Sequence, residues 1–219
     1  MKEVQWSWLG RVPYAPTLER QEARRTGVIE GTADEVLWLL EHDPVITTGR
    51  RPVPDLPSHE AMEQNGIDLV HTNRGGLATF HGPGQLIAYP IIDAWSRGLG
   101  VKGTIGVMEG AVIQWLADYD ICAKRRCGFP GVWVNNEKIC AIGMHFRRGV
   151  SMHGIAVNLD PDWTGFNMIT PCGIQDAGLT SIARLCGTSP SPSEAAHSLA
   201  HHINDNLMRH CNTRSDETG

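Results

Sequence analysis

This chain of 219 residues lacks long apolar runs and a strong excess of either charge. No apolar run approaches the ~18 residues of a membrane-spanning helix. The start, "MKEVQWSWLGRV", has neither the apolar core of a signal peptide nor the Arg- and Ser-rich pattern of a transit peptide. We therefore expect a cytoplasmic protein with no membrane partner.

Basic residues occur in short groups, and the formal net charge is −5. Because no long basic stripe follows the chain, a nucleic-acid partner is not expected. Most such groups are solvated surface. Lys124, Arg125 and Arg126 are retained as a candidate group for docking an acidic partner.

The sequence also lacks the cysteine spacings of zinc sites and CxxC redox pairs. Its six cysteines are Cys122, Cys127, Cys140, Cys172, Cys186 and Cys211. We expect free thiols, most of them buried like small hydrophobic residues. His197, His201 and His202 have no cysteine or acid set beside them, so a polar helix face is predicted there and no metal site.

The composition, 41% hydrophobic and 20% charged, is that of an ordinary globular domain. We expect one catalytic domain over residues 1–211 and a flexible tail over 212–219. Strands are predicted at 5–10, 35–42, 68–72, 85–92 and 151–159, and a hairpin over 131–146 that turns at Asn135-Asn136. Strands outnumber helices and several are linked by hairpins. This pattern predicts an α/β (α+β) fold with a mixed, largely antiparallel sheet flanked by helices.

Three helices are predicted. The first covers 17–27, with Gly27 as its C-cap. The second covers 104–119, where Gly106 and Gly110 share one face and are expected to let the helix lie close to the sheet. The third begins at a capping box formed by Ser191 and Glu194, and its buried stripe is expected to be Ala196, Leu199, Ile203 and Leu207.

The stretch "RGGLATFHGPGQLIAYP", residues 74–90, carries the chemistry. Its glycines allow the backbone to approach a ligand closely and present amide groups at unusual angles. Arg74 and His81 stand at the two ends of the glycine-rich loop. The pattern is too long and specific for a pair of ordinary tight turns.

The stretch resembles the signature of the lipoyl(octanoyl) transferases of lipoate biosynthesis, with Phe80 where that family usually has tyrosine. Three further blocks resemble the family in the same order: "EHDPVITTGR" (41–50), "GVWVNNEKICAIGMHFRRGVSMHGIAVNL" (131–159) and "ITPCGI" (169–174). The resemblance runs from about residue 10 to residue 210. It implies the fold of the biotin and lipoate protein ligase catalytic domain.

The resemblance implies a catalytic pair, with Cys172 as the acyl-thioester nucleophile and Lys138 as its partner. The thiolate is the attacking form of a cysteine, and a nearby ammonium favours it. Without the resemblance, Lys138 would be interpreted as a solvated charge after a hairpin turn. Cys140, two residues further along the same strand, is interpreted as a packing residue.

The resemblance also implies a set of substrate-binding positions. These are Arg74, Gly75, Gly76, Leu77, Ala78, Thr79, Phe80, His81, Ala141, Ile142, Gly143, Gly154, Ile155 and Ala156. His42 and His153 are possible substrate-orienting residues, although a buried histidine is more often a satisfied part of the core.

The implied reaction is a two-step acyl transfer through a cysteine. The donor is octanoyl-acyl carrier protein, and the acceptors are the lipoyl domains of 2-oxoacid dehydrogenase E2 subunits and the glycine cleavage H protein. No cofactor is expected, because a thioester is already activated. Three alternatives stay open: an ATP-dependent lipoate or biotin protein ligase, a transferase that moves octanoyl between carrier proteins, and a non-catalytic carrier-binding module.

Overall fold

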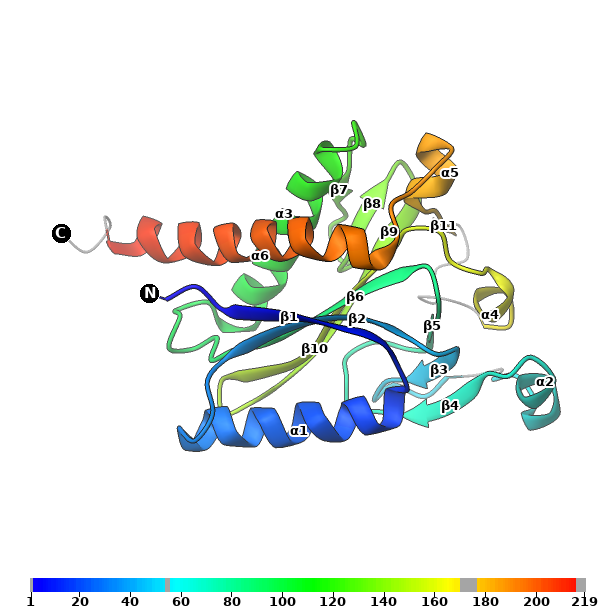
Figure 1. Ribbon diagram of the computed structural model, residues 1–219, viewed down its shortest axis with the longest axis horizontal. Coiled ribbons are helices and arrows are strands. Elements are labelled where there is room, and N and C mark those ends of the chain that lie inside the picture. Colours follow the sequence, from blue (N-terminus) through cyan, green and yellow to red (C-terminus); the bar gives the residue numbers. More distant parts are fainter. Residues whose placement is uncertain (1, 54–55, 170–176, 216–219) are drawn as a thin grey trace.

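The structure, a computed structural model, describes residues 2–53, 56–169 and 177–215, with side chains in the last helix as far as residue 210. Within those ranges, no helix combines the length and apolar character needed to cross a bilayer. A twisted sheet lies at the centre, with one helix on one side of it and two helices on the other (Figure 1).

The main sheet has eight strands in the described part of the chain, in the order β1-β2-β6-β10-β9-β8-β7, with β11 also paired to β9. The β1–β2 and β9–β11 pairs are parallel and the other pairs are antiparallel. The predicted mixed, largely antiparallel sheet is confirmed. The strands are β1 (Gln5–Val12), β2 (Val36–His42), β6 (Gln85–Ile91), β7 (Lys124–Arg125), β8 (Val132–Val134), β9 (Glu137–Arg147), β10 (Val150–Asn158) and β11 (Gly178–Leu179).

A smaller sheet of order β4-β3-β5 holds the glycine-rich stretch beside the main sheet. It consists of β3 (Val45–Thr48), β4 (Asp68–His71) and β5 (Thr79–His81), with α2 (His59–Gln64) before β4. Neither β3 nor β5 was predicted from the sequence. Four consecutive buried residues in β3 show no alternation, and β5 is three residues long between glycines, so neither gives a periodic signal.

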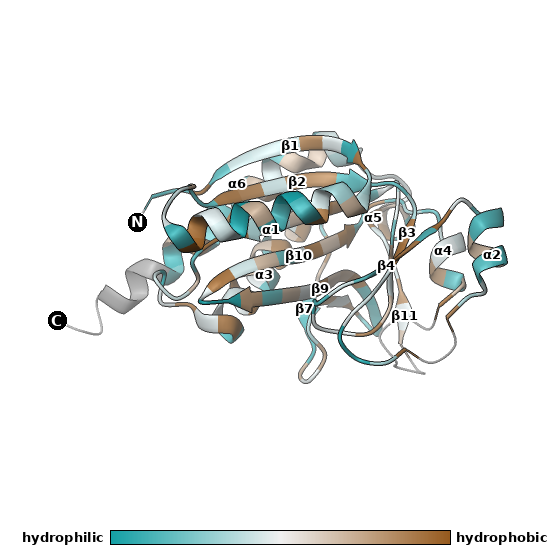
Figure 2. Cartoon of the chain, turned by 90° about the horizontal axis from the view of Figure 1, so that it is seen from below, coloured by the Kyte–Doolittle hydropathy of each residue, from teal (hydrophilic) through white to brown (hydrophobic). Residues whose placement is uncertain are grey.

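Helices cover both faces of the main sheet. α3 (Gly100–Ala117) and α6 (Pro192–Ser215) pack on one face, and α1 (Tyr14–Glu30) lies on the other, beside β2 and β10 (Figure 2). Two short helices, α4 (Thr164–Asn167) and α5 (Ile182–Cys186), flank β11 in the chain. In β2, Leu37 and Leu39 join the α3–α6 core while Trp38 and Leu40 face α1, because successive strand side chains point to opposite faces.

Two local predictions are confirmed. The hairpin between β8 and β9 turns through Asn135 in the left-handed region, at φ 52°. The capping box at the start of α6 is formed, since Ser191 N donates to Glu194 Oε2 over 2.8 Å. The predicted stripe of α6, Ala196, Leu199, Ile203 and Leu207, is buried.

The predicted end of the first helix was wrong. α1 continues through Gly27, and its C-cap is Gly31, at φ 72°. The predicted approach of the α3 glycines to the sheet is met in part, at the edge strand β7, where Arg125 Nη2 donates to Gly106 O over 2.7 Å. A Cβ on Gly110 would meet Arg125 Nη2 at 3.0 Å and Asn206 Oδ1 at 3.1 Å, and Gly106 faces open space.

The cysteine prediction also needs correction. Cys122, Cys127 and Cys186 are exposed free thiols, and Cys140 is the buried one among those with a described environment. Cys140 packs in the α3–α6 core, where burial raises the pKa of its thiol to about 12. Its interpretation as a packing residue is therefore supported. Cys172 and the side chain of Cys211 lie outside the described residues.

Candidate active site

A tight turn at Gly82-Pro83-Gly84 orients the end of the glycine-rich stretch. Gln85 N donates to Gly82 O over 3.3 Å, proline stands at the second position and Gly84 has φ 83° at the third, which is the pattern of a type II turn. A Cβ on Gly84 would also collide with the backbone carbonyl of Asp160. Position 84 therefore requires glycine for two reasons, its positive φ and the closeness of Asp160. The turn sets His81 beside Gln85.

The Arg-Gly-Gly segment lies directly against β9. Gly75 N donates to Met144 O over 3.2 Å, and a Cβ on Gly143 would stand 3.2 Å from Gly75 O. Gly76 has φ 97°, which favours glycine. These glycines let two backbones meet and form one wall of a cavity.

The guanidinium of Arg74 donates hydrogen bonds to neighbouring parts of the protein. Its Nη2 donates to Thr47 O at 2.6 Å and to Thr47 Oγ1 at 2.9 Å, and its Nη1 donates to Gly75 O at 3.0 Å. The guanidinium is buried. It therefore ties the glycine-rich loop to β3 and adds a positive charge beside the cavity.

The cavity, of about 450 Å³, lies where the two sheets meet α3. Its volume falls within the ~300–1,000 Å³ range of small-ligand pockets. Every predicted substrate-binding residue except Phe80 lines it, together with the predicted residues Lys138 and His153. The apolar part of the wall is made by Leu77, Ala78, Val101, Ile105, Phe129, Ala141, Ile142, Met144, Ile155 and Ala156.

Phe80 lies on the other side of β5. Its ring packs edge-on against Phe166, with centroids 5.4 Å apart, in a separate core cluster. Because Thr79 and His81 line the cavity, strand alternation turns Phe80 away from it. The structure therefore places this departure from the usual tyrosine away from the cavity wall, which differs from the predicted role in substrate binding.

Lys138 is buried in the cavity lining, at 7% exposure. Its Nζ donates to Pro130 O over 3.2 Å and lies 4.8 Å from the centre of the Trp133 ring. Gly131 makes room for it, because a Cβ there would stand 3.3 Å from Lys138 Cε. A solvated surface lysine, the usual occupant of such a position, is not what the structure shows.

His42 lies behind the cavity wall. Val12 O can only accept a hydrogen bond, so His42 Nδ1 carries the proton and donates to it over 2.9 Å. His42 Nε2 then accepts from the Tyr89 hydroxyl over 2.8 Å. Burial lowers the pKa of His42 to about 4. Tyr89 lines the cavity, so His42 acts on the site through Tyr89.

His153 is held in an unusual backbone conformation, at φ 60°. Its backbone N donates to Gln21 Oε1 over 2.9 Å, and its ring Nε2 lies 3.1 Å from Asn73 Oδ1. Burial, aided by the charge of Arg74, lowers the pKa of His153 to about 3. A non-glycine residue with positive φ costs about 1–3 kcal/mol and is found preferentially at functional sites.

Several lining residues were not predicted from the sequence. Tyr14, at the start of α1, stacks on His81 with ring centroids 6.2 Å apart. Arg50 and Arg51 follow β3, and Phe129 is 39% exposed. Arg50 ends the block "EHDPVITTGR", which was a usable signal; the single Tyr14 offered none.

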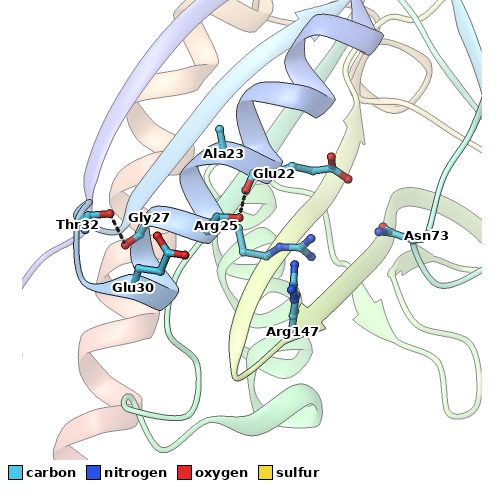
Figure 3. A pocket seen from close by; sticks show the side chains of 9 residues that line it. Glu22, Ala23, Arg25, Gly27, Glu30, Thr32, Asn73 and Arg147 are labelled. Carbon is cyan, nitrogen blue, oxygen red and sulfur yellow. Dashed lines mark hydrogen bonds between the residues drawn. The ribbon is translucent and has the colours of Figure 1, made fainter.

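A second hollow, of about 750 Å³, lies along α1 and the end of β9. Figure 3 shows Arg25 extending toward Arg147, while Glu22 and Glu30 supply opposite charge from α1. This hollow is wide and lined largely by polar and charged residues. It lacks the apolar wall that an acyl chain requires, so the cavity beside Lys138 is the candidate active site.

Residues 13–204 match the family model of the lipoyl protein ligase A/B catalytic domain. An octanoyltransferase of Novosphingobium aromaticivorans is 40% identical over 204 residues, which cover 91% of this chain and 89% of that relative. One of an Azoarcus species is 45% identical over 174 residues, covering 80% and 74% of the two chains.

Two solved structures share the fold. A bipartite lipoate protein ligase of Thermoplasma acidophilum has a TM-score of 0.73 at 16% identity, over 95% of this chain and 85% of that one. Biotin protein ligase of Aquifex aeolicus has a TM-score of 0.58 at 14% identity, over 94% and 71%. The chain therefore belongs to the lipoyl protein ligase A/B catalytic-domain family. Among the members of that family it groups with relatives named octanoyltransferase, and it is an acyltransferase.

Proposed function

We propose that this enzyme transfers an octanoyl group from octanoyl-acyl carrier protein to a lysine of a lipoyl domain, through a thioester on Cys172. The observation that carries the proposal is the burial of Lys138 in the wall of an apolar cavity beside the glycine-rich stretch. Burial of an ammonium group costs free energy, and an ion pair with a nearby anion offsets that cost. A thiolate at Cys172 is such an anion, and the ammonium in turn favours the thiolate over the thiol.

Chain connectivity supports the pairing of these two residues. Cys172 itself lies outside the described residues, but β11 begins six residues later. Six residues span at most about 20 Å. In β11, Leu179 pairs with Lys138, and the next residue, Thr180, donates its N–H to Lys138 O over 3.1 Å. The strand β11, which comes after Cys172 in the chain, runs alongside Lys138.

The first half-reaction uses the charged Lys138 as an acid. The Cys172 thiolate attacks the donor thioester, a new sulfur–carbon bond forms and the pantetheine sulfur leaves. Lys138 gives that sulfur a proton and becomes neutral. The apolar walls contributed by Ile142 and Ile155 accommodate the acyl chain.

The second half-reaction restores the enzyme. The amine of the acceptor lysine attacks the acyl-enzyme, the carbon–sulfur bond breaks and an amide forms. Neutral Lys138 takes up one proton as the thiolate is released, which re-forms the ion pair. The acceptors we propose are the lipoyl domains of 2-oxoacid dehydrogenase E2 subunits and the glycine cleavage H protein.

The donor is an acidic protein, and we propose that Lys124 contributes to its docking. Within the basic group at 124–126, Arg125 pairs with Glu109 and the guanidinium of Arg126 lies 5.0 Å from the Trp133 ring centre. Lys124 is exposed. It is thus the residue of the three best able to meet a partner.

Intact mass measured after incubation with octanoyl-acyl carrier protein, without ATP, tests the reaction. The wild-type chain and Cys140→Ser are expected to gain one hydroxylamine-labile octanoyl group, and Cys172→Ser none. Cys140→Ser is the matched control because its thiol is buried. An adduct on Cys172→Ser, or modification of the lipoyl domain that requires ATP, would contradict the proposal.

Lys138→Arg tests the lysine separately, because arginine keeps the charge but does not give up its proton. We expect acyl transfer to the lipoyl domain to fall by about 10²-fold or more, the scale of general acid–base catalysis. Transfer at the wild-type rate would remove Lys138 from the proton steps. Transfer to a second carrier protein in preference to a lipoyl domain would identify the other class of octanoyl transferase.

A further inference from the structure

Three buried polar residues behind the cavity wall, Gln85, Asn158 and Thr180, take no part in the reaction as proposed above. They form a buried chain of hydrogen bonds. Asn158 Nδ2 donates to Thr180 O over 3.0 Å, and Gln85 Nε2 donates to Asn158 Oδ1 over 2.9 Å. Gln85 Oε1 lies 3.2 Å from His81 Nδ1. This row of hydrogen bonds crosses the end of the sheet, from the residue after β11, beside Lys138, to the glycine-rich stretch.

The direction of every hydrogen bond in this chain follows from its first member. A backbone carbonyl such as Thr180 O only accepts, so the amide nitrogen of Asn158 must face it. Asn158 then presents its oxygen to the amide nitrogen of Gln85, and Gln85 presents its oxygen to His81. His81 Nδ1 must therefore carry the proton and donate. The imidazole of His81 is neutral, so its Nε2 holds a bare lone pair.

That lone pair is available to a ligand. His81 lines the cavity, and no group among the described residues forms a hydrogen bond with its Nε2. Burial, with His42 and Arg74 nearby, keeps the pKa of His81 well below its usual value, so the ring stays neutral at physiological pH. A hydrogen-bond acceptor in the cavity wall favours a ligand that brings an N–H or O–H to it.

We propose that His81 Nε2 accepts a hydrogen bond from the attacking amine of the acceptor lysine, and that Gln85 and Asn158 are positioning residues that fix His81 in this form. The inference rests on the proposed function. An atom that can only accept is unable to stabilise an oxyanion or to protonate the leaving pantetheine sulfur. The pantetheine arm also carries amide N–H groups, but the amine of the acceptor lysine is the N–H donor whose nitrogen must itself reach the thioester carbon.

The protons balance without charging His81. The acceptor ammonium loses one proton to water before attack, and the resulting amine is held by His81 Nε2 through one of its two N–H bonds. The nitrogen–carbon bond forms and the carbon–sulfur bond breaks. The second proton goes to neutral Lys138, which re-forms its ion pair with the Cys172 thiolate. His81 orients the nitrogen lone pair toward the thioester carbon throughout.

Nitrogen-15 NMR of histidine-labelled protein tests the tautomer directly. The His81 signal, assigned by its loss in His81→Phe, is expected to show a protonated Nδ1 and an unprotonated Nε2 between pH 6 and pH 8. A proton on Nε2, or a charged ring in this range, would overturn the inference.

Single-turnover kinetics test the role. The two rates are formation of the octanoyl-enzyme from the carrier protein, and its consumption by a lipoyl domain, both followed by intact mass. His81→Phe keeps an aromatic ring against Tyr14 and removes the acceptor. We expect the ratio of the second rate to the first to fall about tenfold, the value of one hydrogen bond of about 1.4 kcal/mol. His71→Phe, at an exposed position of β4 that is not part of the cavity lining, is the matched control and is expected to leave the ratio unchanged.

Gln85→Glu is a second variant that tests the same role if His81→Phe fails to fold. A carboxylate beside Nδ1 raises the pKa of His81. The second step of this variant is then expected to slow as the pH falls from 8 to 6, because a protonated Nε2 no longer accepts, while the wild-type rate ratio stays level. Equal losses in both steps, or no pH dependence in Gln85→Glu, would assign His81 a structural role. Absence of an octanoyl-enzyme in the wild type would instead count against the proposed function itself.

Discussion

Replacement of Thr47 by valine removes a hydroxyl that the buried guanidinium of Arg74 uses twice. Thr47 Oγ1 accepts from Arg74 Nη2 at 2.9 Å and from Nε at 3.2 Å, and Thr47 itself is fully buried. Valine has nearly the same shape, so packing is preserved while two charge-assisted hydrogen bonds are lost. Each such bond contributes about 1.5–3 kcal/mol. Thr47 O remains as an acceptor at 2.6 Å, and we expect a net loss of about 3 kcal/mol.

Urea denaturation measures this loss as a change in the free energy of unfolding. Thr48→Val is the matched control: it lies next in β3, and its hydroxyl pairs with the His71 ring over 2.8 Å in a single hydrogen bond, so about 1 kcal/mol is expected. Thr47→Ser keeps the hydroxyl and is expected to restore most of the lost stability. Because Arg74 ties the glycine-rich loop to β3, Thr47→Val is also expected to raise KM for the octanoyl donor. If Thr47→Val and Thr48→Val destabilise equally, the guanidinium does not depend on this hydroxyl.

Three further predictions concern the turn, the buried histidines and the donor. Gly84→Ala is expected to cost more than about 3 kcal/mol in urea denaturation, because the new Cβ meets the Asp160 carbonyl, whereas Gly10→Ala, with a similar φ of 75° and nothing within 4 Å, should cost about 1 kcal/mol; similar losses would refute the steric argument. Burial lowers the pKa of His42 to about 4, so between pH 6.5 and pH 4 the unfolded chain binds a proton that the folded chain does not, and stability falls as the pH falls. His42→Phe should therefore reduce the slope of the unfolding free energy against pH by about 1.4 kcal/mol per pH unit. An unchanged slope would mean that His42 is protonated in the folded protein. Lys124→Glu should lower kcat/KM for the carrier protein several-fold at low salt and much less at high salt, while Lys2→Glu, also exposed, should not; a loss that ignores salt would exclude electrostatic docking.

The parts of the fold that were predictable are those with a strong local signal. The capping box at Ser191 and the left-handed turn at Asn135 depend on residues adjacent in sequence, and both formed as expected. The alternation in β1 and the apolar run of β2 gave strands at the expected positions.

The remaining parts depend on tertiary contacts that no local pattern encodes. Gly27 was predicted to end α1, but its missing side chain makes room for Ala33, since a Cβ there would stand 2.7 Å from Ala33 Cβ. Gly110 makes room for Asn206 of α6 as well as for Arg125 of the sheet, a helix contact that was not expected. The glycine of a cap and the glycine of a close approach look the same in sequence.

The candidate site divides in the same way. The family resemblance pointed to Lys138 and to much of the cavity wall, and the structure adds how part of that wall forms: the backbone at Gly75 meets the backbone at Met144. Sequence reasoning offered Arg74 as a group for gripping a substrate, without any sign that Thr47 occupies much of its guanidinium. The role of Gln85 was also invisible, because its partner Asn158 is distant in the chain.

The indole of Trp133 lies 4.8 Å from Lys138 Nζ and attracts the charged amine more than the neutral one. Such an attraction amounts to about 2 kcal/mol at a desolvated position. If Lys138 loses its proton in the first half-reaction, this attraction is lost. The free energy of the acyl-enzyme is then raised relative to that of the resting enzyme. Because deacylation restores the charge on Lys138, Trp133 would favour that step. A smaller, non-aromatic side chain at position 133 would let the acyl-enzyme accumulate.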